Sequence, residues 1–565
     1  MKKISRLLII LGGLLAIMMG PATSWAQRLQ ARIIGQSNEA THMYMRAELT
    51  NPYGRDMGFR LEIKNMGYQQ NYDLGEVVLG PGQRRVLHIP LLKTDYGNFT
   101  IESRDETGEQ SRDVASRVLK LYLNIDTLRS WATESQMIDF TNKFNGITGG
   151  ASLSRYHGSS GNFVSQIEPD LMPDNWMCYL PFRAVMLPEA IYRRLPPVSL
   201  NALTEWVQSG GQLVIYEAER AASERMMLGR IDYVAKNPIK VNILDKNWTR
   251  QPTEWRRFFG NTGSLAYDFP FIIESSSGRL GGVILATLFF IVAGPINHFY
   301  FSRKKKIRTL LLSLPVLSLG FCFLIFIYFL ASQGFARRGG SISVMVMDEK
   351  EDKAFTFSRH VFYSGLYPLG GFKFDGDTAF CPMVRDMDEQ AMTFDLSEGY
   401  ALESGLFTPS RNFHYLTATP MTTRAKLIWD KEEMTVTNGF DAAIEHVLIQ
   451  DGNVIYESRE IAKGGKGKMK QIDTESNMGA GKILLARRGG PQENLAITYI
   501  ERHMDDMTGV FDADSEYATY AIFFKSPPAD TQAGVNIKGD NKFFVLVARS
   551  ERMAGATQSD MAMGE

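Results

Sequence analysis

Two long apolar stretches in the middle of the chain constrain its fold more than any other feature. Leu280–Phe301 and Thr309–Ser332 contain no Asp, Glu, Lys or Arg, and each is long enough to cross the core of a bilayer as a helix, which takes about 20 residues. The loop between them, residues 302–308, is strongly basic. Its charged residues are Arg303, Lys304, Lys305, Lys306 and Arg308. Because basic residues in short loops stay in the cytoplasm, the sequence predicts a transmembrane hairpin (280–301 and 309–332) whose flanking domains both lie on the opposite side.

The N-terminus is typical of an exported protein. Residues 1–26 combine a basic start (Lys2, Lys3 and Arg6), the apolar run Leu7–Met19 and small residues at Ser24 and Ala26, which indicate a secretory signal peptide. An uncleaved anchor helix is the alternative. Both interpretations place the following segment outside the cytoplasm.

Composition excludes several classes of partner and cofactor. The chain has 62 basic and 62 acidic residues, so no basic excess favours nucleic acid. The histidines are scattered without metal-ligand spacing, and the cysteines form no C-x-x-C motif, so we expect no metal and no cofactor. Cys178 and Cys381 both fall in exported regions, where a disulfide between them could persist. Two unpaired thiols are the alternative.

The region before the hairpin divides into two predicted domains. Residues 27–115 contain short alternating runs such as Met43–Leu49 and Gly58–Ile63, separated by turn signals, which predict a β-sandwich. Residues 116–250 alternate strand and helix patterns, which predicts a parallel α/β sheet. The runs are Val118–Asn124, Leu128–Phe144, Arg183–Leu187, Val198–Gln208 and Gln212–Tyr216. Residues 251–279 are predicted to connect this domain to the membrane.

Part of the α/β region resembles a known family. Arg183–Pro188, followed by Leu200–Ile215 with its Trp206-Val207-Gln208-Ser209-Gly210-Gly211 unit, resembles a class I glutamine amidotransferase-like domain, which implies a flavodoxin-like fold. That family uses a Cys between glycines and a later His-x-Glu pair. Cys178 has no flanking glycine, and no His follows within the domain. The resemblance therefore implies the fold without its active site.

After the hairpin, residues 333–552 are predicted to form a β-rich domain, with a flexible tail at 553–565. Strand patterns occur at Ser341–Met347, Lys353–Val361, Thr435–Asn438, Ile444–Tyr456 and Phe543–Ala548. The spacing of Thr437-Asn438 and the later Gly464-Gly465 is similar to that of Thr50-Asn51 and the later Gly80-Pro81-Gly82. An internal repeat is therefore a hypothesis.

Candidate ligand-binding residues follow from the α/β pattern. Ligands of open parallel sheets bind at the carboxyl ends of the strands, which points to Asp126, Pro188, Glu189 and Glu217. The alternative is that these are ordinary loop residues after strands. No residue shows a catalytic spacing.

The chain as a whole is thus expected to be multidomain α/β plus β. Its paired helices with the run Gly294-Pro295-Ile296-Asn297-His298-Phe299 resemble those of uncharacterised bacterial two-helix envelope proteins. That resemblance implies the inner membrane, both large domains in the periplasm, and envelope partners such as von Willebrand A-domain proteins. We expect a non-enzymatic scaffold or interaction protein. The alternatives are an envelope glycan or peptidoglycan hydrolase or transferase, and a ligand sensor that acts through a membrane partner.

Overall fold

The computed structural model describes only part of the chain. The described residues are 29–35, 42–65, 70–92, 99–108, 110–114, 116–117, 171–182, 184–219, 222–235, 279–304, 307–333, 338–349, 351–364, 371–383, 392–397, 399–404, 412–451, 454–472, 519–524 and 538–549. Several predictions lie outside them: the signal peptide, Val118–Asn124, Asp126, Leu128–Phe144, Lys305, Lys306, most of the connector 251–279 and the tail 553–565.

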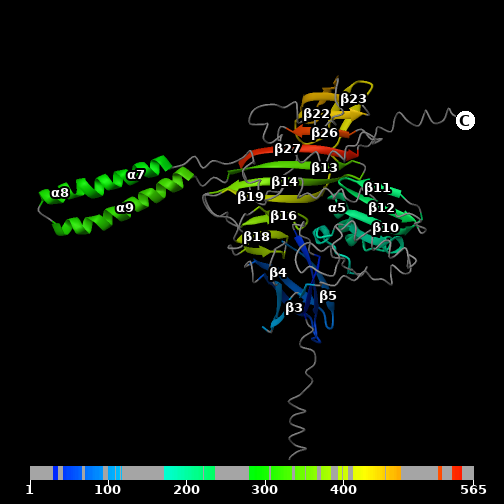
Figure 1. The fold of residues 1–565 in the computed structure, drawn as a ribbon, viewed down its shortest axis with the longest axis horizontal. Helices are drawn as coiled ribbons and strands as arrows, with labels where there is room; N and C mark the ends of the chain where they lie inside the picture. Colours follow the sequence, from blue (N-terminus) through cyan, green and yellow to red (C-terminus); the bar gives the residue numbers. More distant parts are fainter. Residues whose placement is uncertain are drawn as a thin grey trace, which may run out of the picture.

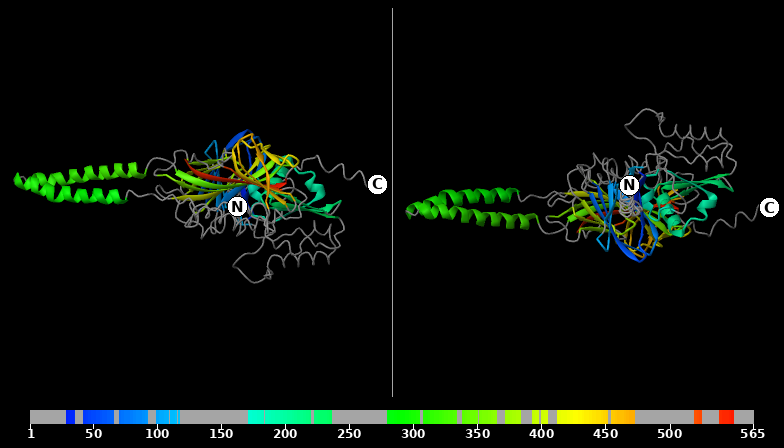
Figure 2. Two further views of the ribbon diagram at one scale, coloured as in Figure 1. Left: turned by 90° about the horizontal axis from the view of Figure 1, so that it is seen from above. Right: turned by 90° about the horizontal axis from the view of Figure 1, so that it is seen from below.

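The protein is rich in β-structure, with several sheets, as the sequence predicts. We divide it into an N-terminal block (29–117), a middle block (171–235), a helical hairpin (279–333) and a C-terminal block (338–549). Figure 1 shows the hairpin leaving the body on the side opposite the middle block, and the two views in Figure 2 agree. The N-terminal and C-terminal blocks lie against each other although the hairpin separates them in sequence.

The N-terminal block packs two sheets across one core. Alternation of apolar and polar residues gives each strand a buried face, so that Met45, Ala47 and Leu49 of one sheet meet Phe59, Leu61 and Ile63 of the other. The sheet orders are β5-β2-β1-β8 and β4-β3-β6-β7. The strands are β1 (Leu29–Gly35), β2 (His42–Thr50), β3 (Met57–Asn65), β4 (Gln70–Leu79), β5 (Arg84–Leu92), β6 (Phe99–Asp105), β7 (Gln110–Val114) and β8 (Ser116–Arg117).

The C-terminal block is built on a nine-stranded sheet in the order β16-β19-β14-β13-β27-β26-β22-β23-β25. A three-stranded sheet, β20-β21-β24, packs on one end of it through Leu427 and Val436. The predicted run Ile444–Tyr456 falls in two antiparallel strands, not one. The strands are β13 (Arg338–Asp348), β14 (Lys353–Tyr363), β16 (Ala379–Pro382), β19 (Phe413–Thr422), β20 (Leu427–Asp430), β21 (Thr435–Asn438), β22 (Ile444–Asp451), β23 (Val454–Ile461), β24 (Lys466–Lys468), β25 (Lys470–Ile472), β26 (Thr519–Phe524) and β27 (Lys538–Arg549).

The N-terminal and C-terminal blocks share a sheet. Three strands from the C-terminal block extend the sheet beside β4, so that its full order is β15-β18-β17-β4-β3-β6-β7. These strands are β15 (Phe372–Phe374), β17 (Met392–Asp395) and β18 (Tyr400–Ser404). The core extends across the junction, where the rings of Tyr72 and Phe394 stack with centroids 4.9 Å apart. The two blocks therefore fold as one body, which their separation in sequence did not predict.

The middle block contains a parallel strand–helix–strand unit at the predicted positions. β9 (Ala184–Pro188), α5 (Pro197–Gln208) and β10 (Gln212–Ala218) follow one another, and β10 pairs in parallel with β9 and with β12 (Gly229–Ala235). β11 (Ala222–Met226) completes the sheet in antiparallel orientation. The apolar face of α5 buries Leu203, Trp206 and Val207, and these join the core that also holds Phe355 and Phe357 of the C-terminal block.

The suspected internal repeat is present in the structure. In the first copy, one sheet has the order β1-β2-β5 and the other β4-β3-β6-β7. In the second copy, the corresponding sheets have the orders β20-β21-β24 and β23-β22-β26-β27. All of these neighbouring strands pair antiparallel in both copies. Each copy has a buried asparagine at the same place. The Asn51 side chain accepts from Tyr53 N and donates to the carbonyls of Arg55 and Leu79.

Asn438 makes the equivalent bonds in the second copy. Its side chain accepts from Phe440 N and donates to the carbonyls of Ala442 and Ala462. Each amide thus ties the end of the second strand to the turn before the fifth strand. The repeated T-N…G-G or G-P-G spacing in the sequence therefore reflects a common tertiary contact.

The hairpin consists of two antiparallel helical segments. α7 (Arg279–Ile291), a π-helical turn η6 (Val292–Ile296) and α8 (Asn297–Arg303) form the first, and α9 (Ile307–Gln333) forms the second. Within the described residues, Gly281–Arg303 is the one helix that meets the length and hydropathy expected of a membrane span, and Leu312–Tyr328 is a shorter apolar segment. The helices run further into the basic loop than predicted, since Arg303 ends α8 and Arg308 lies in α9.

Candidate functional site

The structure brings together three of the four residues predicted to line a crevice. Pro188 ends β9 and Glu189 begins α4 (Glu189–Tyr192). Glu217 lies in β10, next to Tyr216, whose register partner is Pro188. All three are therefore at the carboxyl edge of the parallel strands. Asp126, the fourth, lies outside the described residues.

The carboxylate of Glu189 is engaged in holding this edge together. Its Oε1 accepts from Arg193 Nη2 at 2.6 Å and from Arg193 Nε at 3.1 Å, while its Oε2 accepts from the backbone N of Glu219 at 3.1 Å. Three donors thus occupy both oxygens of this carboxylate. Glu189 thus fastens α4 to the end of β10.

Two tyrosines lie beside this edge. Burial, followed by the charge of Glu224, raises the pKa of Tyr192. Burial also raises the pKa of Tyr233, and Tyr192, Glu224 and Glu189 add to the shift. Both phenols stay protonated near neutral pH and can serve as hydrogen-bond donors, but not as nucleophiles. No group of three His, Cys, Asp or Glu side chains suited to a metal occurs among the residues that the structure describes.

A second candidate is a junction segment that the sequence analysis did not single out. The 3₁₀-helix η3 (Trp176–Tyr179) is fully buried, and Asn175 caps it by accepting from Met177 N at 2.9 Å. It contacts β2 and β5 of the N-terminal block. Trp176 Nε1 donates to the carbonyl of Asp377 at 2.8 Å, and its ring packs edge-on against Phe355. The segment therefore joins all three blocks.

The sequence indicates that this segment is buried, but not which parts of the chain bury it. The run Asn175-Trp176-Met177-Cys178-Tyr179 is dense in large apolar residues and is flanked by Pro173 and Pro181. Such a run lacks the period of a helix or a strand. Its burial by two other blocks is a tertiary property.

Cys178 and Cys381 form no disulfide in the structure. Cys178 lies in η3 and Cys381 in β16, and both are buried. The possible disulfide is therefore not formed, and the blocks are joined by packing and backbone pairing instead. Burial, with a smaller contribution from Asp174, raises the pKa of the Cys178 thiol. A thiol in that state is a poor nucleophile.

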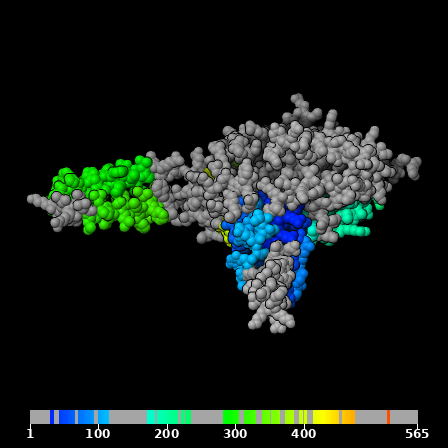
Figure 3. Space-filling model, turned by 60° about the horizontal axis from the view of Figure 1, so that its bottom comes forward, coloured from blue at the N-terminus to red at the C-terminus, as the bar shows by residue number. Residues whose placement is uncertain are grey.

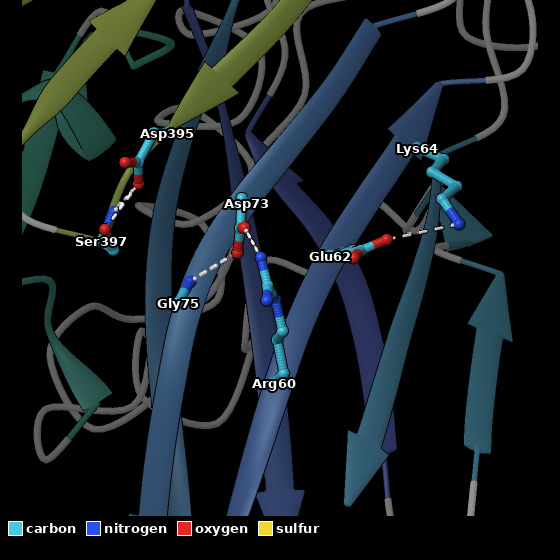
Figure 4. Close-up of polar contacts among 7 residues, drawn as sticks. All are labelled: Arg60, Glu62, Lys64, Asp73, Gly75, Asp395 and Ser397. Carbon is cyan, nitrogen blue, oxygen red and sulfur yellow. Dashed lines mark hydrogen bonds and ion pairs between the residues drawn. The ribbon is translucent and has the colours of Figure 1, made fainter. Parts of the chain in front are cut away.

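The seam between β4 and β17 carries charge on its solvent side. Asp73 and Asp395 are register partners in this parallel pair. Figure 4 shows that Asp73 accepts from the backbone N of Gly75 and from Arg60, whereas Asp395 accepts from Ser397. Gly75 has φ +72°, and a Cβ there would lie 2.7 Å from the Cβ of Ser397. Glycine is therefore required where the two strands approach.

The hairpin presents an apolar surface outward. Phe290, Leu312 and Leu319 are 71%, 73% and 76% exposed, and Figure 3 shows the hairpin standing clear of the N-terminal block. Soluble proteins rarely expose contiguous apolar surface on this scale. Two of the residues predicted to set topology, Arg303 and Lys304, lie at its far tip and cover the rings of Phe299 and Tyr300.

Comparison with known proteins assigns no family. No protein-family model matches the chain, and no curated protein matches it. A solved structure described as "X-ray structure of Northeast Structural Genomics Consortium target SoR45" is similar to 16% of this chain and 85% of its own length, with 13% sequence identity and a TM-score of 0.12. A likeness this slight supports no inference about fold or function.

Proposed function

We propose that this chain is a non-catalytic scaffold, anchored in the bacterial inner membrane by its hairpin, with both large regions in the periplasm. The outward apolar surface of α7, α8 and α9 carries the proposal, because a bilayer is the solvent that stabilises it. Arg303 and Lys304 at the tip favour a cytoplasmic position for the turn. Periplasmic export of the N-terminal block by the signal peptide belongs to the same proposal.

The shared sheet supports two membrane crossings. Strands β4 and β17 pair directly, so the N-terminal and C-terminal blocks lie on the same side of any membrane. The chain between them must then cross an even number of times. Two crossings, by α7–α8 and by α9, satisfy this condition, whereas a single crossing does not.

A scaffold agrees better with the site than an enzyme does. Glu189 is held by Arg193 and Glu219, and Cys178 lies in a buried 3₁₀-helix rather than in an exposed turn after a strand. The strand–helix–strand unit from β9 to β10 suits the flavodoxin-like fold that the amidotransferase resemblance implies, without its nucleophile. We therefore propose a degenerate domain of that kind between two β-rich regions, with envelope proteins, von Willebrand A-domain proteins among them, as partners.

Topology can be tested with alkaline phosphatase fusions to the full chain. We expect activity from fusions near residue 270 and after residue 552, and none from a fusion at Lys304. Activity at Lys304 would contradict the proposed orientation. Equal inactivity at all three sites would contradict export itself.

The scaffold role can be tested by cross-linking the chain in intact membranes. We expect reproducible envelope proteins to be captured, and the same set to be captured by the variant Glu189→Ala/Glu217→Ala/Asp126→Ala. Loss of cellular function in that variant, with partners and thermal stability unchanged, would favour the hydrolase or transferase instead. Absence of any reproducible partner would contradict the scaffold.

A further inference from the structure

The inward-facing residues of the first hairpin helix change register partway along it. The half-buried positions are Gly281, Gly282, Leu285, Ala286, Phe289, Val292 and Ala293, which form one helix face against a partner. Gly282 and Phe289 are seven residues apart, and the next seven-residue step along that face falls at Ile296. Instead, Ile296 is 55% exposed and Asn297 is 4% exposed. The buried face has therefore moved by one residue.

The π-helical turn explains this shift. Pro295 has no backbone N–H to donate, and the N–H of Asn297 reaches back five residues to the carbonyl of Val292. The helix thus accommodates the proline by replacing an i to i−4 hydrogen bond with an i to i−5 bond, which adds one residue to that turn. One residue corresponds to a rotation of about 100° around the helix axis. That rotation brings Asn297 into line with Phe289, whose ring contacts Phe321 of α9 at 5.2 Å between centroids.

Asn297 then meets a hydroxyl on the other helix. Ser313 Oγ, in α9, donates to Asn297 Oδ1 at 3.1 Å. By contrast, the hydroxyl of Thr287 donates to the carbonyl of Val283 in its own helix. The second polar atom of Asn297, Nδ2, is buried and has no acceptor among the described residues. An amide in this position would lose its hydrogen bond if α9 slid past it.

We propose that Asn297 is a positioning residue: the π-turn directs it to Ser313, and this pair fixes the longitudinal register of the hairpin. The inference rests on the proposed membrane anchor, since apolar contacts in lipid have little directional preference and a polar pair supplies it. α9 ends at Gln333 and β13 begins at Arg338. The register therefore sets the position of the central strands of the nine-stranded sheet relative to the membrane.

The test uses the full-length chain in membranes, with Cys322→Ser to remove the exposed hairpin thiol. One cysteine pair, Phe289→Cys with Phe321→Cys, reports the register in the structure. A second pair, Phe289→Cys with Ile325→Cys, reports a slide by one helical turn. The ratio of the two disulfide yields, formed under the same mild oxidation, measures the register.

Matched variants separate hydrogen bonding from packing. Ser313→Val and Ser313→Thr have side chains of nearly the same shape, but only threonine keeps the hydroxyl. We expect threonine to preserve the ratio, and valine or Asn297→Leu to lower it about three- to tenfold, the range of hydrogen bonds between membrane helices. Pro295→Ala restores a backbone N–H, so the helix can close without the π-turn and Asn297 turns about 100° away from the face of Phe289. This variant should therefore lower the ratio although Asn297 and Ser313 are intact.

Two results would overturn the inference in different ways. A ratio that is the same in Ser313→Val, Ser313→Thr and Pro295→Ala, in a chain that remains in the membrane fraction, would refute the positioning role alone. A parent chain that is recovered outside the membrane fraction would refute the anchor, and the positioning role with it.

Discussion

Asp73 and Asp395 lie opposite each other as register partners in parallel strands, although 321 residues and the hairpin separate them in sequence. Like charges placed this way repel. Arg60 offsets the repulsion by pairing with Asp73, and Asp73 and Asp395 both raise the pKa of its guanidinium. On the other face of the same seam, Tyr72 stacks on Phe394. The junction thus combines an apolar contact inside with a balanced charge cluster outside.

Removal of the apolar contact should destabilise the body that the two blocks form. Phe394 is fully buried, so Phe394→Ala should reduce the free energy of unfolding by about 3–5 kcal/mol. Chemical denaturation of the detergent-solubilised chain measures this loss, with Val78→Ala as a control, because Val78 is 63% exposed in the neighbouring strand. Equal stability of both variants would mean that the seam contributes little to the fold.

The two asparagines of the repeat should be equivalent in energy as well as in geometry. Asn51→Ala and Asn438→Ala each leave buried backbone groups without a hydrogen bond, which costs about 2–3 kcal/mol. The exposed Asn201 donates to Glu205 and accepts from Lys353, both at the surface, so Asn201→Ala provides the control. Urea denaturation measures each loss. If Asn438→Ala had little effect on stability while Asn51→Ala was destabilising, the two copies would share their geometry but not their energetics.

Close backbone packing in the middle block should make Gly229 intolerant of substitution. A Cβ at Gly229 would lie 1.9 Å from the carbonyl oxygen of Val207, whereas a Cβ at Gly54 would meet nothing within 4 Å. Gly229→Ala must therefore displace α5 from β12, with a loss of about 1–3 kcal/mol, as for overpacked cores. Thermal unfolding should show a lower midpoint for Gly229→Ala and little change for Gly54→Ala. A normal midpoint for Gly229→Ala would contradict this packing.

Buried histidines should make the fold sensitive to acid. Burial lowers the pKa of His42 and of His360 from 6.5 to about 3. The unfolded chain therefore binds more protons than the folded chain between these values. Stability is intact above pH 6.5 and falls as the pH drops toward 3, by about 1.4 kcal/mol per pH unit for each histidine.

Substitution of one histidine should reduce that slope. Between pH 7 and pH 5, His360→Gln should lose about 2 kcal/mol less than the parent chain does. Ser358→Ala changes the same buried strand without removing a titrating group, so it should keep the parental slope. Denaturation curves at the two pH values measure the difference. Identical slopes for His360→Gln and the parent would show that His360 does not contribute.

Local sequence patterns predicted individual strands and helices better than they predicted the tertiary contacts between them. The run Gln212–Tyr216 and the helix pattern Val198–Gln208 match β10 and α5 because each reflects the period of its own backbone. The carboxyl-edge position of Pro188 and Glu189 followed from the same pattern. The pattern could not predict that the Glu189 carboxylate accepts hydrogen bonds from Arg193 and from the backbone N of Glu219. Those bonds depend on where the side chains lie after packing.

The sequence by itself determined the apolar hairpin, the basic turn and the alternation that makes most of the chain β-structure, because each is a property of consecutive residues. Only the tertiary structure decided that β4 pairs with β17, that Trp176 reaches Asp377, and that Asn297 faces Ser313. A period of two shows that a strand has a buried face, but any strand edge offers the same backbone donors and acceptors. The choice among edges is made by side-chain packing across the whole body, which no local pattern contains.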